Sequence, residues 1–423
     1  MASISTRDDP AEQHVVSSLP ADNPVVALDQ QEFDAKGATT VAAAHFSHDL
    51  YSSLLGPLIV AVQDKLAISL FVASLMVPAQ QMPSILQPFI GVLADRTSKR
   101  WFVVLAPAVA GISVSSIGLA PNIGMVLLLL LVSGLASAAF HTPAVALVGE
   151  YGGRKMGKAM AVFMAGGELA RTVGPLMITG AIMLFTLEGS WVLMVFGIVA
   201  SIILFFTIDT SASDAAEKAK IRAPLKPLLR ARQKTILALL GYSAVKNLAT
   251  APFSIFLVVY LVSKGHSQWY AAISLSTLFT AGIIGGFLGG TLSDRFGRRN
   301  VMFVTALGTA PLSYLYLWLE NGSWFVLPVL GLAGIVSMAT RPIQLALAQE
   351  VMPEARGPMA GVMLAFGFVS MSLIALAFGA FSDAVGIEVS FWAIPATAFL
   401  ALPLIAMLPR RGEALRQPAP VGD

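Results

Sequence analysis

Twelve long apolar runs dominate this sequence and limit what the chain can fold into. They lie at about 38–62, 68–94, 101–121, 123–148, 158–184, 188–208, 235–262, 268–293, 299–319, 322–348, 357–383 and 387–408. A helix that crosses the roughly 30 Å hydrocarbon core of a bilayer needs about 20 apolar residues, and each run reaches this length. The strands of a transmembrane β-barrel would alternate polar and apolar residues instead. The runs therefore predict an all-α membrane protein with twelve transmembrane helices.

The composition of the whole chain also indicates a lipid environment. Of its 423 residues, 56% are hydrophobic and 12% are charged, and the mean hydropathy is +0.76. A soluble domain carries about 25% charged residues, so a cytosolic enzyme and a disordered protein are both excluded. Cysteine is absent, which excludes disulfides, thiolate nucleophiles and cysteine-based metal or iron–sulfur sites.

A polar break divides the runs into two sets of six. Residues 209–234 contain seven Lys and Arg residues and two prolines, as expected of a basic cytoplasmic linker. This linker separates a six-helix bundle over 38–208 from a second one over 235–408. Residues 1–37 carry seven acidic residues against two basic ones and read as a disordered cytoplasmic tail, and 409–423 form a C-terminal cytoplasmic tail.

The distribution of basic residues predicts the orientation. Twenty of the 27 Lys and Arg residues lie on the even-numbered connections, the linker and the C-terminal tail. The odd-numbered connections carry only Lys65 and Lys264. The positive-inside rule then places both termini in the cytoplasm, for a multi-pass protein of the bacterial inner membrane. Since the basic residues do not cluster on a soluble module, we expect no nucleic-acid partner.

One short motif occurs in both halves. The segment 91–100 (GVLADRTSKR), after the second run, recurs 199 residues later as 290–299 (GTLSDRFGRR), after the eighth run. Equivalent motifs on equivalent loops are typical of a transporter built from two related bundles, with its binding site between them.

The pattern G-x-x-x-D-R-x-G-R-R resembles the signature loop of the major facilitator superfamily, and the resemblance covers 38–408. It implies two six-helix bundles and alternating access. We expect the glycine to admit a neighbouring helix, and the aspartate to accept hydrogen bonds at a helix N-terminus across the bundle interface and to pair with an arginine. The alternative is that the cations only obey the positive-inside rule. The first copy departs from the pattern at Ser98, where glycine is usual. The gating candidates are Gly91, Asp95, Arg96, Gly290, Asp294, Arg295, Gly297 and Arg298.

Three further segments resemble the fosmidomycin-resistance branch of efflux proteins within that superfamily. They are 45–57 (HFSHDLYSSLLGP), 86–91 (LQPFIG) and 137–144 (SAAFHTPA). This chain departs from the branch where Thr142 precedes Pro143 and where Glu168 replaces a usual asparagine. Both departures lie at expected cavity positions, so the substrate need not be that of the branch's namesake.

The segment 166–175 (GGELARTVGP) is similar to the Gly-Pro motif of antiporters in this superfamily. Its drug–proton exchangers also tend to carry an arginine in the fourth span, where this chain has Leu131. Coupling to protons therefore has to be argued from other residues.

Ionisable residues inside the apolar runs are the candidates for proton coupling. A charge at a helix centre costs about 2.5–3.5 kcal/mol, so such a residue usually faces a cavity or a partner. His45 and Asp49 are four residues apart, share a helix face and can hydrogen-bond. We assign proton coupling to Asp49, Glu168, His48 and His45. The alternative is a permanently satisfied polar cluster that packs the first helix.

The remaining intramembrane polar residues predict an anionic substrate. Glu168 and Arg171 are three residues apart and are expected to pair, which leaves Lys246 and Arg341 as uncompensated cations. The substrate-binding candidates are Arg341, Lys246, Arg171, His141, Asn247 and Gln80. Alternatives are a snorkelling Arg341 at a helix kink and helix-to-helix hydrogen bonds from the amides.

Other motif matches are rejected. The segment 152–158 (GGRKMGK) lacks the following Ser or Thr and the preceding strand of a phosphate-binding loop, so no ATP is expected. Gly282, Gly286 and Gly290, four residues apart, predict a close helix-packing face instead of a nucleotide site. The five histidines and scattered carboxylates suggest no metal-ligand set, so no metal or other cofactor is expected.

These observations predict a proton-coupled secondary active transporter that exports a small anionic compound, such as a fosmidomycin-like antibiotic or related metabolite. A proton symporter that imports a small organic acid is the alternative. An enzyme is not expected, because no grouping of nucleophile and base occurs, and a membrane sensor would need a signalling domain. The partners are then a small-molecule substrate, protons and the lipid bilayer, and we expect a monomer.

Overall fold

The computed structural model describes residues 32–208, 230, 232–352 and 356–410. Within these ranges the regular structure is helical throughout. Three parts of the predicted organisation lie outside the described residues: residues 1–31 of the expected N-terminal tail, most of the linker, and the residues after 410.

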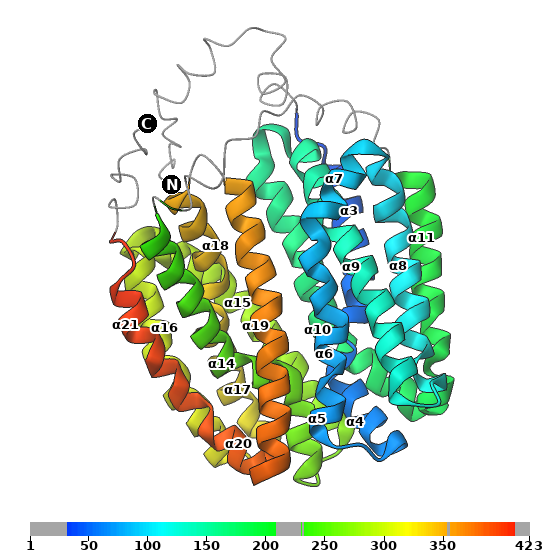
Figure 1. The fold of residues 1–423 in the computed structure, drawn as a ribbon, viewed down its shortest axis with the longest axis vertical. Helices are drawn as coiled ribbons and strands as arrows, with labels where there is room; N and C mark the ends of the chain where they lie inside the picture. Colours follow the sequence, from blue (N-terminus) through cyan, green and yellow to red (C-terminus); the bar gives the residue numbers. More distant parts are fainter. Residues whose placement is uncertain (1–31, 209–229, 231, 353–355, 411–423) are drawn as a thin grey trace, which may run out of the picture.

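The first half of the chain builds one bundle, drawn in blue to green on the right of Figure 1. Its elements are α3 (Ala35–Ser52), α4 (Leu55–Leu66), α5 (Leu70–Ser74), α6 (Met76–Gln81), η1 (Met82–Leu86), α7 (Gln87–Arg96), α8 (Lys99–Ser115), η2 (Ser116–Leu119), α9 (Ile123–Gly152), η3 (Gly153–Lys155), α10 (Met156–Gly189), η4 (Ser190–Leu193) and α11 (Met194–Thr207).

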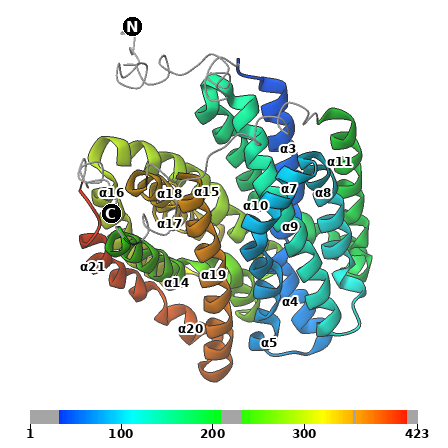
Figure 2. The ribbon, with the colours of Figure 1, turned by 45° about the horizontal axis from the view of Figure 1, so that its top comes forward.

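The second half builds the other bundle, drawn in green to red, and the two bundles stand side by side in Figures 1 and 2. Its elements are α14 (Gln233–Ser263), α15 (Gln268–Phe296), α16 (Arg298–Leu319), η6 (Trp324–Val326), α17 (Leu327–Met338), α18 (Thr340–Val351), α19 (Arg356–Val385), α20 (Ile387–Ala393), η8 (Pro395–Leu400) and α21 (Ala401–Ala406).

Prolines explain why the first two predicted spans are chains of short helices. A proline within a helix lacks an N–H and clashes with the carbonyl four residues earlier. Pro57 of α4 stands four residues after Ser53, and Ser53 lies at the break between α3 and α4. Pro78 of α6 stands four residues after Ser74, and α5 ends at Ser74. The predicted second span continues through η1, which contains Pro83.

The helices present apolar side chains outwards, as a lipid-facing surface requires. In the described part of the chain, nine helical segments are long and apolar enough to cross a membrane, and one of them, Met156–Thr207, holds two predicted spans. The two proline-broken spans complete the predicted set of twelve. Phe206, Phe287 and Trp318 are each more than 70% exposed, although they are large apolar residues. Exposure of this kind marks contact with lipid.

Among the described residues, the two bundles share one hydrophobic core at one end and have separate cores at the other. At the end away from where α3 begins and α21 ends, one core contains residues of both bundles, including Leu58 of α4 and Leu257 of α14. At the end where α3 begins, here called the terminal end, each bundle has its own core. Phe140 belongs to the core of the first bundle and Ile343 to that of the second. The bundles are therefore joined at the opposite end and separately packed at the terminal end.

Helices from the two bundles pack against each other in pairs along this interface. Helix α10 packs against α15, α14 against α4, and α19 against α5 and α6. The Asp383 carboxylate of α19 accepts hydrogen bonds from the backbone N–H groups of Leu70 (3.0 Å) and Phe71 (2.9 Å). These are the first residues of α5, and a carboxylate there satisfies donors that the helix leaves open. Asp383 thus connects the bundles at the opposite end.

The glycines of α15 form a packing face in a different register from the predicted one. A Cβ on Gly282, Gly285 or Gly289 would lie 2.1–2.2 Å from atoms of α17 or of Ala339, which follows it. A Cβ on Gly286 or Gly290 would meet nothing within 4 Å. The expectation that Gly286 and Gly290 admit a neighbouring helix is therefore wrong. Residues four apart and residues alternately three and four apart both lie along one face of a helix, so spacing alone does not decide which glycines pack. Tertiary packing selects Gly282, Gly285 and Gly289.

The adjacent glycines Gly285 and Gly286 allow a matched test. We expect Gly285→Ala to destabilise the protein by about 1–3 kcal/mol, because its Cβ would collide with the carbonyl oxygen of Ile335 and separate two helix backbones. Gly286→Ala has free space, so we expect no loss or a gain of up to about 1 kcal/mol from helix propensity. Apparent melting temperatures of the detergent-purified variants measure the difference. Equal melting temperatures would contradict the packing register.

Candidate transport site

A histidine–aspartate–histidine cluster lies inside the first bundle. His45 and Asp49 come from α3 and His141 comes from α9. His45 Nε2 lies 3.2 Å from one Asp49 carboxylate oxygen, and His141 Nε2 lies 3.4 Å from the other. The side chains of His45 and Asp49 are 5% and 10% exposed, and that of His141 is 25% exposed. The predicted contact of His45 with Asp49 is present, and His141, which was expected at the substrate site, joins it.

Backbone carbonyls determine which nitrogen of each imidazole faces the carboxylate. His45 Nδ1–H donates to the carbonyl oxygen of Phe163 (2.8 Å), and His141 Nδ1–H donates to that of Ser137 (2.9 Å). A carbonyl oxygen only accepts, so both Nδ1 atoms carry the hydrogen. In neutral histidines both Nε2 lone pairs would then face carboxylate lone pairs. The two contacts therefore require positive charge between nitrogen and oxygen, supplied by protons or by a cation.

This geometry changes one expectation from the sequence. One ligand atom each from His45, Asp49 and His141 lies within 4.8 Å of the other two. The expectation that the histidines and carboxylates form no metal-ligand set is therefore wrong as far as the geometry is concerned. Sequence spacing could not reveal the set, because His141 comes from a different helix.

Glycine in α10 makes room for the cluster. A Cβ on Gly167 would lie 2.5 Å from His45 Cε1, and a Cβ on Gly166 would lie 2.3 Å from the carbonyl oxygen of Ala42. These glycines let α3 lie directly against α10, with the His45 ring stacked on Phe163 at a centroid distance of 4.0 Å. The glycines of segment 166–175 therefore position His45.

His48 lies beside the cluster, with its ring edge-on to that of His141 at a centroid distance of 5.8 Å. Its side chain is fully buried and stacks on Phe140 with a centroid distance of 4.7 Å. Neither ring nitrogen finds a hydrogen-bond partner among the described residues. The structure thus brings His45 and His141, and not His48, into contact with Asp49.

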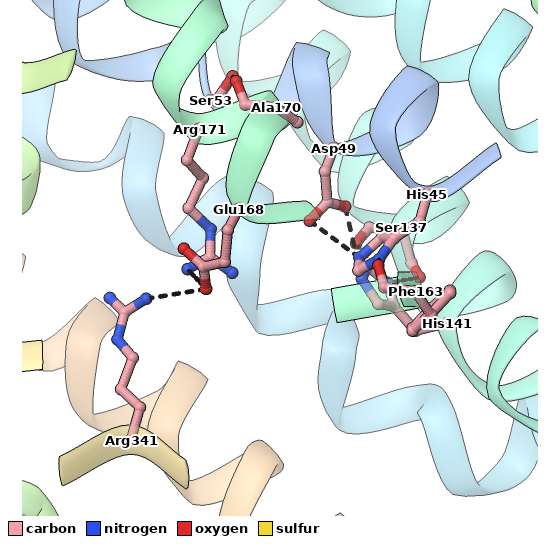
Figure 3. Close-up of polar contacts among 10 residues, drawn as sticks. All are labelled: His45, Asp49, Ser53, Ser137, His141, Phe163, Glu168, Ala170, Arg171 and Arg341. Atoms are coloured by element: carbon pink, nitrogen blue, oxygen red, sulfur yellow. Dashed lines mark hydrogen bonds and ion pairs between the residues drawn. The ribbon is translucent and has the colours of Figure 1, made fainter. Parts of the chain in front are cut away.

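A second charged cluster joins the two bundles. Arg171 Nη1 lies 3.0 Å from Glu168 Oε1 within α10, and Arg341 Nη1 of α18 reaches the same oxygen at 3.6 Å (Figure 3). The expectation that Arg341 is uncompensated is therefore wrong, because Glu168 is shared between two guanidinium groups. One carboxylate and two guanidinium groups still leave a net charge of about +1. The side chains of Arg171 and Arg341 remain 31% and 34% exposed, so this charge is accessible.

Lys246 lies in a different place from the arginines. It lines a small cavity within the second bundle, between α14, α16 and α18. Hydroxyl groups supply much of the lining, from Tyr242, Thr250, Thr305, Thr309, Ser337 and Thr340. No described carboxylate forms an ion pair with Lys246. Lys246 thus lies in a cavity lined by hydroxyl groups and has no acidic partner among the residues that the structure describes.

The two amide candidates differ. The Asn247 side-chain amide donates to Ser370 Oγ at 2.8 Å and so connects α14 with α19. For Asn247 this is the hydrogen bond between helices that was the alternative to substrate binding. Gln80 of α6 is 5% exposed, and its Nε2 has no partner among the described residues. Of the two, Gln80 keeps an unused hydrogen-bond donor.

The second copy of the repeated loop holds contacts within its own bundle. Arg298 lies 3.2 Å from Asp294 and donates to Glu350 of α18 through Nε at 2.8 Å. Asp294 is 70% exposed, and no contact of its side chain with the described residues of the first bundle is seen. Arg295 lies over the ring of Phe296, 5.3 Å from its centroid.

The first copy has an equivalent pair. Lys99 lies 3.7 Å from Glu150 of α9, as Arg298 pairs with Glu350. Glu150 and Glu350 lie 200 residues apart, so the 199-residue interval of the repeat does not align them, and sequence spacing indicated neither. The surroundings of Gly91 and the side chains of Asp95 and Arg96 lie outside what the structure describes.

Backbone geometry explains the departure at Ser98. Gly297 has φ +89°, a conformation that favours glycine, at the junction of α15 and α16. Ser98, its counterpart, has φ −148° and ψ 123°, an extended conformation open to any residue. The first copy therefore does not need glycine.

Comparison with known proteins decides the family. A model of the Major Facilitator Superfamily matches residues 41–375 and, in a second overlapping match, residues 272–423. The chain belongs to the Major Facilitator Superfamily. This major facilitator protein is 27% identical over 349 residues to the MFS-type transporter YfnC of Bacillus subtilis (strain 168), covering 79% of this chain and 82% of YfnC. It is 25% identical over 378 residues to the fosmidomycin resistance protein of Escherichia coli (strain K12), covering 87% and 90%.

Solved structures agree on the fold. A bacterial homolog of the human lysosomal transporter Spinster, in an inward-facing and occupied conformation, matches with TM-score 0.70 at 16% identity, covering 97% of this chain and 98% of that one. A D-xylose–proton symporter matches with TM-score 0.68 at 14% identity, covering 89% and 98%. The predicted fold class is confirmed, and the family is one of membrane transporters for small molecules, not of enzymes.

Reversing the charges of the cross-bundle contact tests it. Glu168→Arg places three guanidinium groups together, so we expect a lower melting temperature and less monodisperse protein. Adding Arg341→Glu restores an opposite charge across the interface and is expected to recover much of the loss. Adding Lys246→Glu to Glu168→Arg gives the same net charge without that contact and serves as the control. Equal recovery by both second changes would contradict a specific pairing.

Proposed function

We propose that this transporter exports a small anionic compound in exchange for protons. The observation that carries the proposal is the arrangement in Figure 3. A carboxylate that needs positive charge on both sides lies beside a cluster with a net positive charge, and that cluster spans the two bundles. The first group suits a proton, and the second suits an anion.

The proton site is Asp49 with His45 and His141. Each Nε2···O contact is satisfied when a proton lies between the two atoms, so the cluster accommodates up to two protons. Burial makes an unprotonated cluster costly, because the lone pairs would face each other without water. Uptake and release of protons there is therefore tied to changes in the surroundings. Glu168 is the second candidate carrier, since it is shared by two arginines.

The substrate site is the pair Arg171 and Arg341. Guanidinium groups bind phosphonate, phosphate and carboxylate oxygens in a fork-like geometry. An anion that binds both arginines competes with Glu168 for them, and a carboxylate released from its cations takes up a proton more readily. Anion binding and protonation of Glu168 are thereby linked. The similarity to the Escherichia coli fosmidomycin resistance protein supports fosmidomycin or a related anion as the substrate.

The packing of the bundles supports alternating access around this site. The charged clusters lie between a shared core at one end and two separate cores at the terminal end. Rocking one bundle against the other would open the shared core and bring the separate cores together. With both termini and the linker in the cytoplasm, the described conformation faces inwards.

Proton flux on addition of fosmidomycin tests the exchange. In inside-out vesicles with an acidified interior, we expect fosmidomycin to dissipate the pH gradient and an unrelated neutral drug to have no effect. Asp49→Asn should abolish this proton movement, because its side chain no longer carries a titratable carboxylate, while fosmidomycin binding persists. Vesicles without the protein control for leakage. Asp64→Asn, at an exposed aspartate of α4, is the matched charge control.

Each outcome of this experiment is informative. Undiminished coupling in Asp49→Asn would remove Asp49 from the mechanism. Silence with fosmidomycin would discard that substrate. Acidification of the vesicle interior with a small organic acid, in place of dissipation, would indicate a symporter.

Cysteine labelling tests the orientation in a chain that has no cysteine of its own. Asn321 lies on the connection after α16 and Asn300 lies near the start of α16, and both are exposed. We expect a membrane-impermeant maleimide to label Asn321→Cys in intact cells, because the positive-inside rule places this connection outside. Asn300→Cys should be labelled only after the membrane is opened. The reverse pattern would invert the topology without affecting the fold.

A further inference from the structure

The separations within the histidine–aspartate–histidine cluster match those of a tetrahedral metal site. Bonds of about 2.0–2.1 Å from zinc to nitrogen and oxygen place neighbouring tetrahedral ligands about 3.3 Å apart. His45 Nε2 and His141 Nε2 lie 3.2 Å and 3.4 Å from the two oxygens of Asp49. One ligand atom from each residue lies within 4.8 Å of the other two, so only small side-chain shifts close the third edge.

The surroundings of the cluster hold its histidines as metal ligands are usually held. A metal-binding histidine almost always donates its other ring N–H to a carbonyl, carboxylate or water, which directs the free lone pair to the metal. His45 and His141 both donate Nδ1–H to backbone carbonyls, those of Phe163 and Ser137. Gly167 leaves space for the His45 ring, so the main chain of three helices fixes this arrangement.

We propose that His45, Asp49 and His141 form a binding site for a divalent transition-metal ion of the Zn²⁺ class. Two imidazole nitrogens and one carboxylate oxygen suit Zn²⁺, Co²⁺ or Ni²⁺. Mg²⁺ and Ca²⁺ prefer oxygen ligands, and soft Cu⁺ prefers sulfur, which a chain without cysteine does not supply as thiolate.

This inference goes beyond proton exchange, because one dication replaces up to two protons at the same position. Three protein ligands leave a fourth tetrahedral position for water or a substrate oxygen. The ion reaches the site past His141, the most exposed member of the three. A bound ion therefore blocks protonation of Asp49 and is expected to inhibit proton-coupled transport.

Cobalt spectroscopy on the detergent-purified full chain, prepared without a histidine tag, tests the site directly. Co²⁺ in a tetrahedral site gives strong visible d–d absorption, whereas aqueous Co²⁺ absorbs weakly. We expect saturable absorption at one Co²⁺ per chain, abolished by competing Zn²⁺. Asp49→Asn and His141→Gln should each weaken Co²⁺ binding by more than about 100-fold. His266→Gln, which alters a histidine–glutamate pair of the second bundle, should bind as the parent does.

A thiolate in place of the carboxylate gives a signature that a merely structural role would not produce. Asp49→Cys introduces a single cysteine whose sulfur lies one bond from Cβ, against two bonds for the carboxylate oxygen, and the longer metal–sulfur bond of about 2.3 Å offsets part of this difference. We expect this variant to bind Co²⁺ with an added sulfur-to-cobalt charge-transfer band in the near ultraviolet. Melting curves and size-exclusion profiles of every variant show that loss of binding is not loss of folding.

Two results would overturn the metal site. One is the absence of saturable tetrahedral absorption in the parent protein. The other is absorption that persists unchanged in folded Asp49→Asn and His141→Gln. The titration needs no transport, so its failure leaves proton exchange untouched, and failure of the vesicle experiment leaves the metal site untouched.

Discussion

The cost of charge inside a lipid-facing protein is the constraint on which this structure depends. An isolated charge at a helix centre costs about 2.5–3.5 kcal/mol, and many large apolar side chains are exposed on the outer surface. Asp49 and Glu168 are accordingly each placed between two basic side chains. Their partners come from the same helix and from a second one. Each carboxylate is therefore a point at which two helices must remain close or the charge must be neutralised.

Much of the fold followed from local sequence patterns. The length and apolar character of the twelve runs, and the repeat at an interval of 199 residues, determine a bundle pair without knowledge of any contact. The contacts of His45 with Asp49 and of Arg171 with Glu168 also followed, because partners three or four residues apart on a helix face each other. Contacts between residues of the same helix were therefore predictable from the sequence.

The remaining contacts depend on tertiary packing, and sequence spacing does not contain it. His141 reaches Asp49 from α9, and Arg341 reaches Glu168 from the other bundle. The glycine face of α15 was predicted in the wrong register because both registers are helical, and only α17 decides between them. Asp383 lies near the end of a helix with no local partner, and its role appears only where it meets α5.

The two charged clusters differ in one respect that matters for coupling. All three members of the histidine–aspartate–histidine cluster belong to the first bundle, so rocking of the bundles leaves their geometry intact. The contact of Glu168 with Arg341 crosses between the bundles, so the same motion must break it. A cation held by the first cluster can influence that motion through α10, which packs against α3 and carries Glu168 and Arg171. In the proposed mechanism, helix α10 therefore connects the cation site with the anion site.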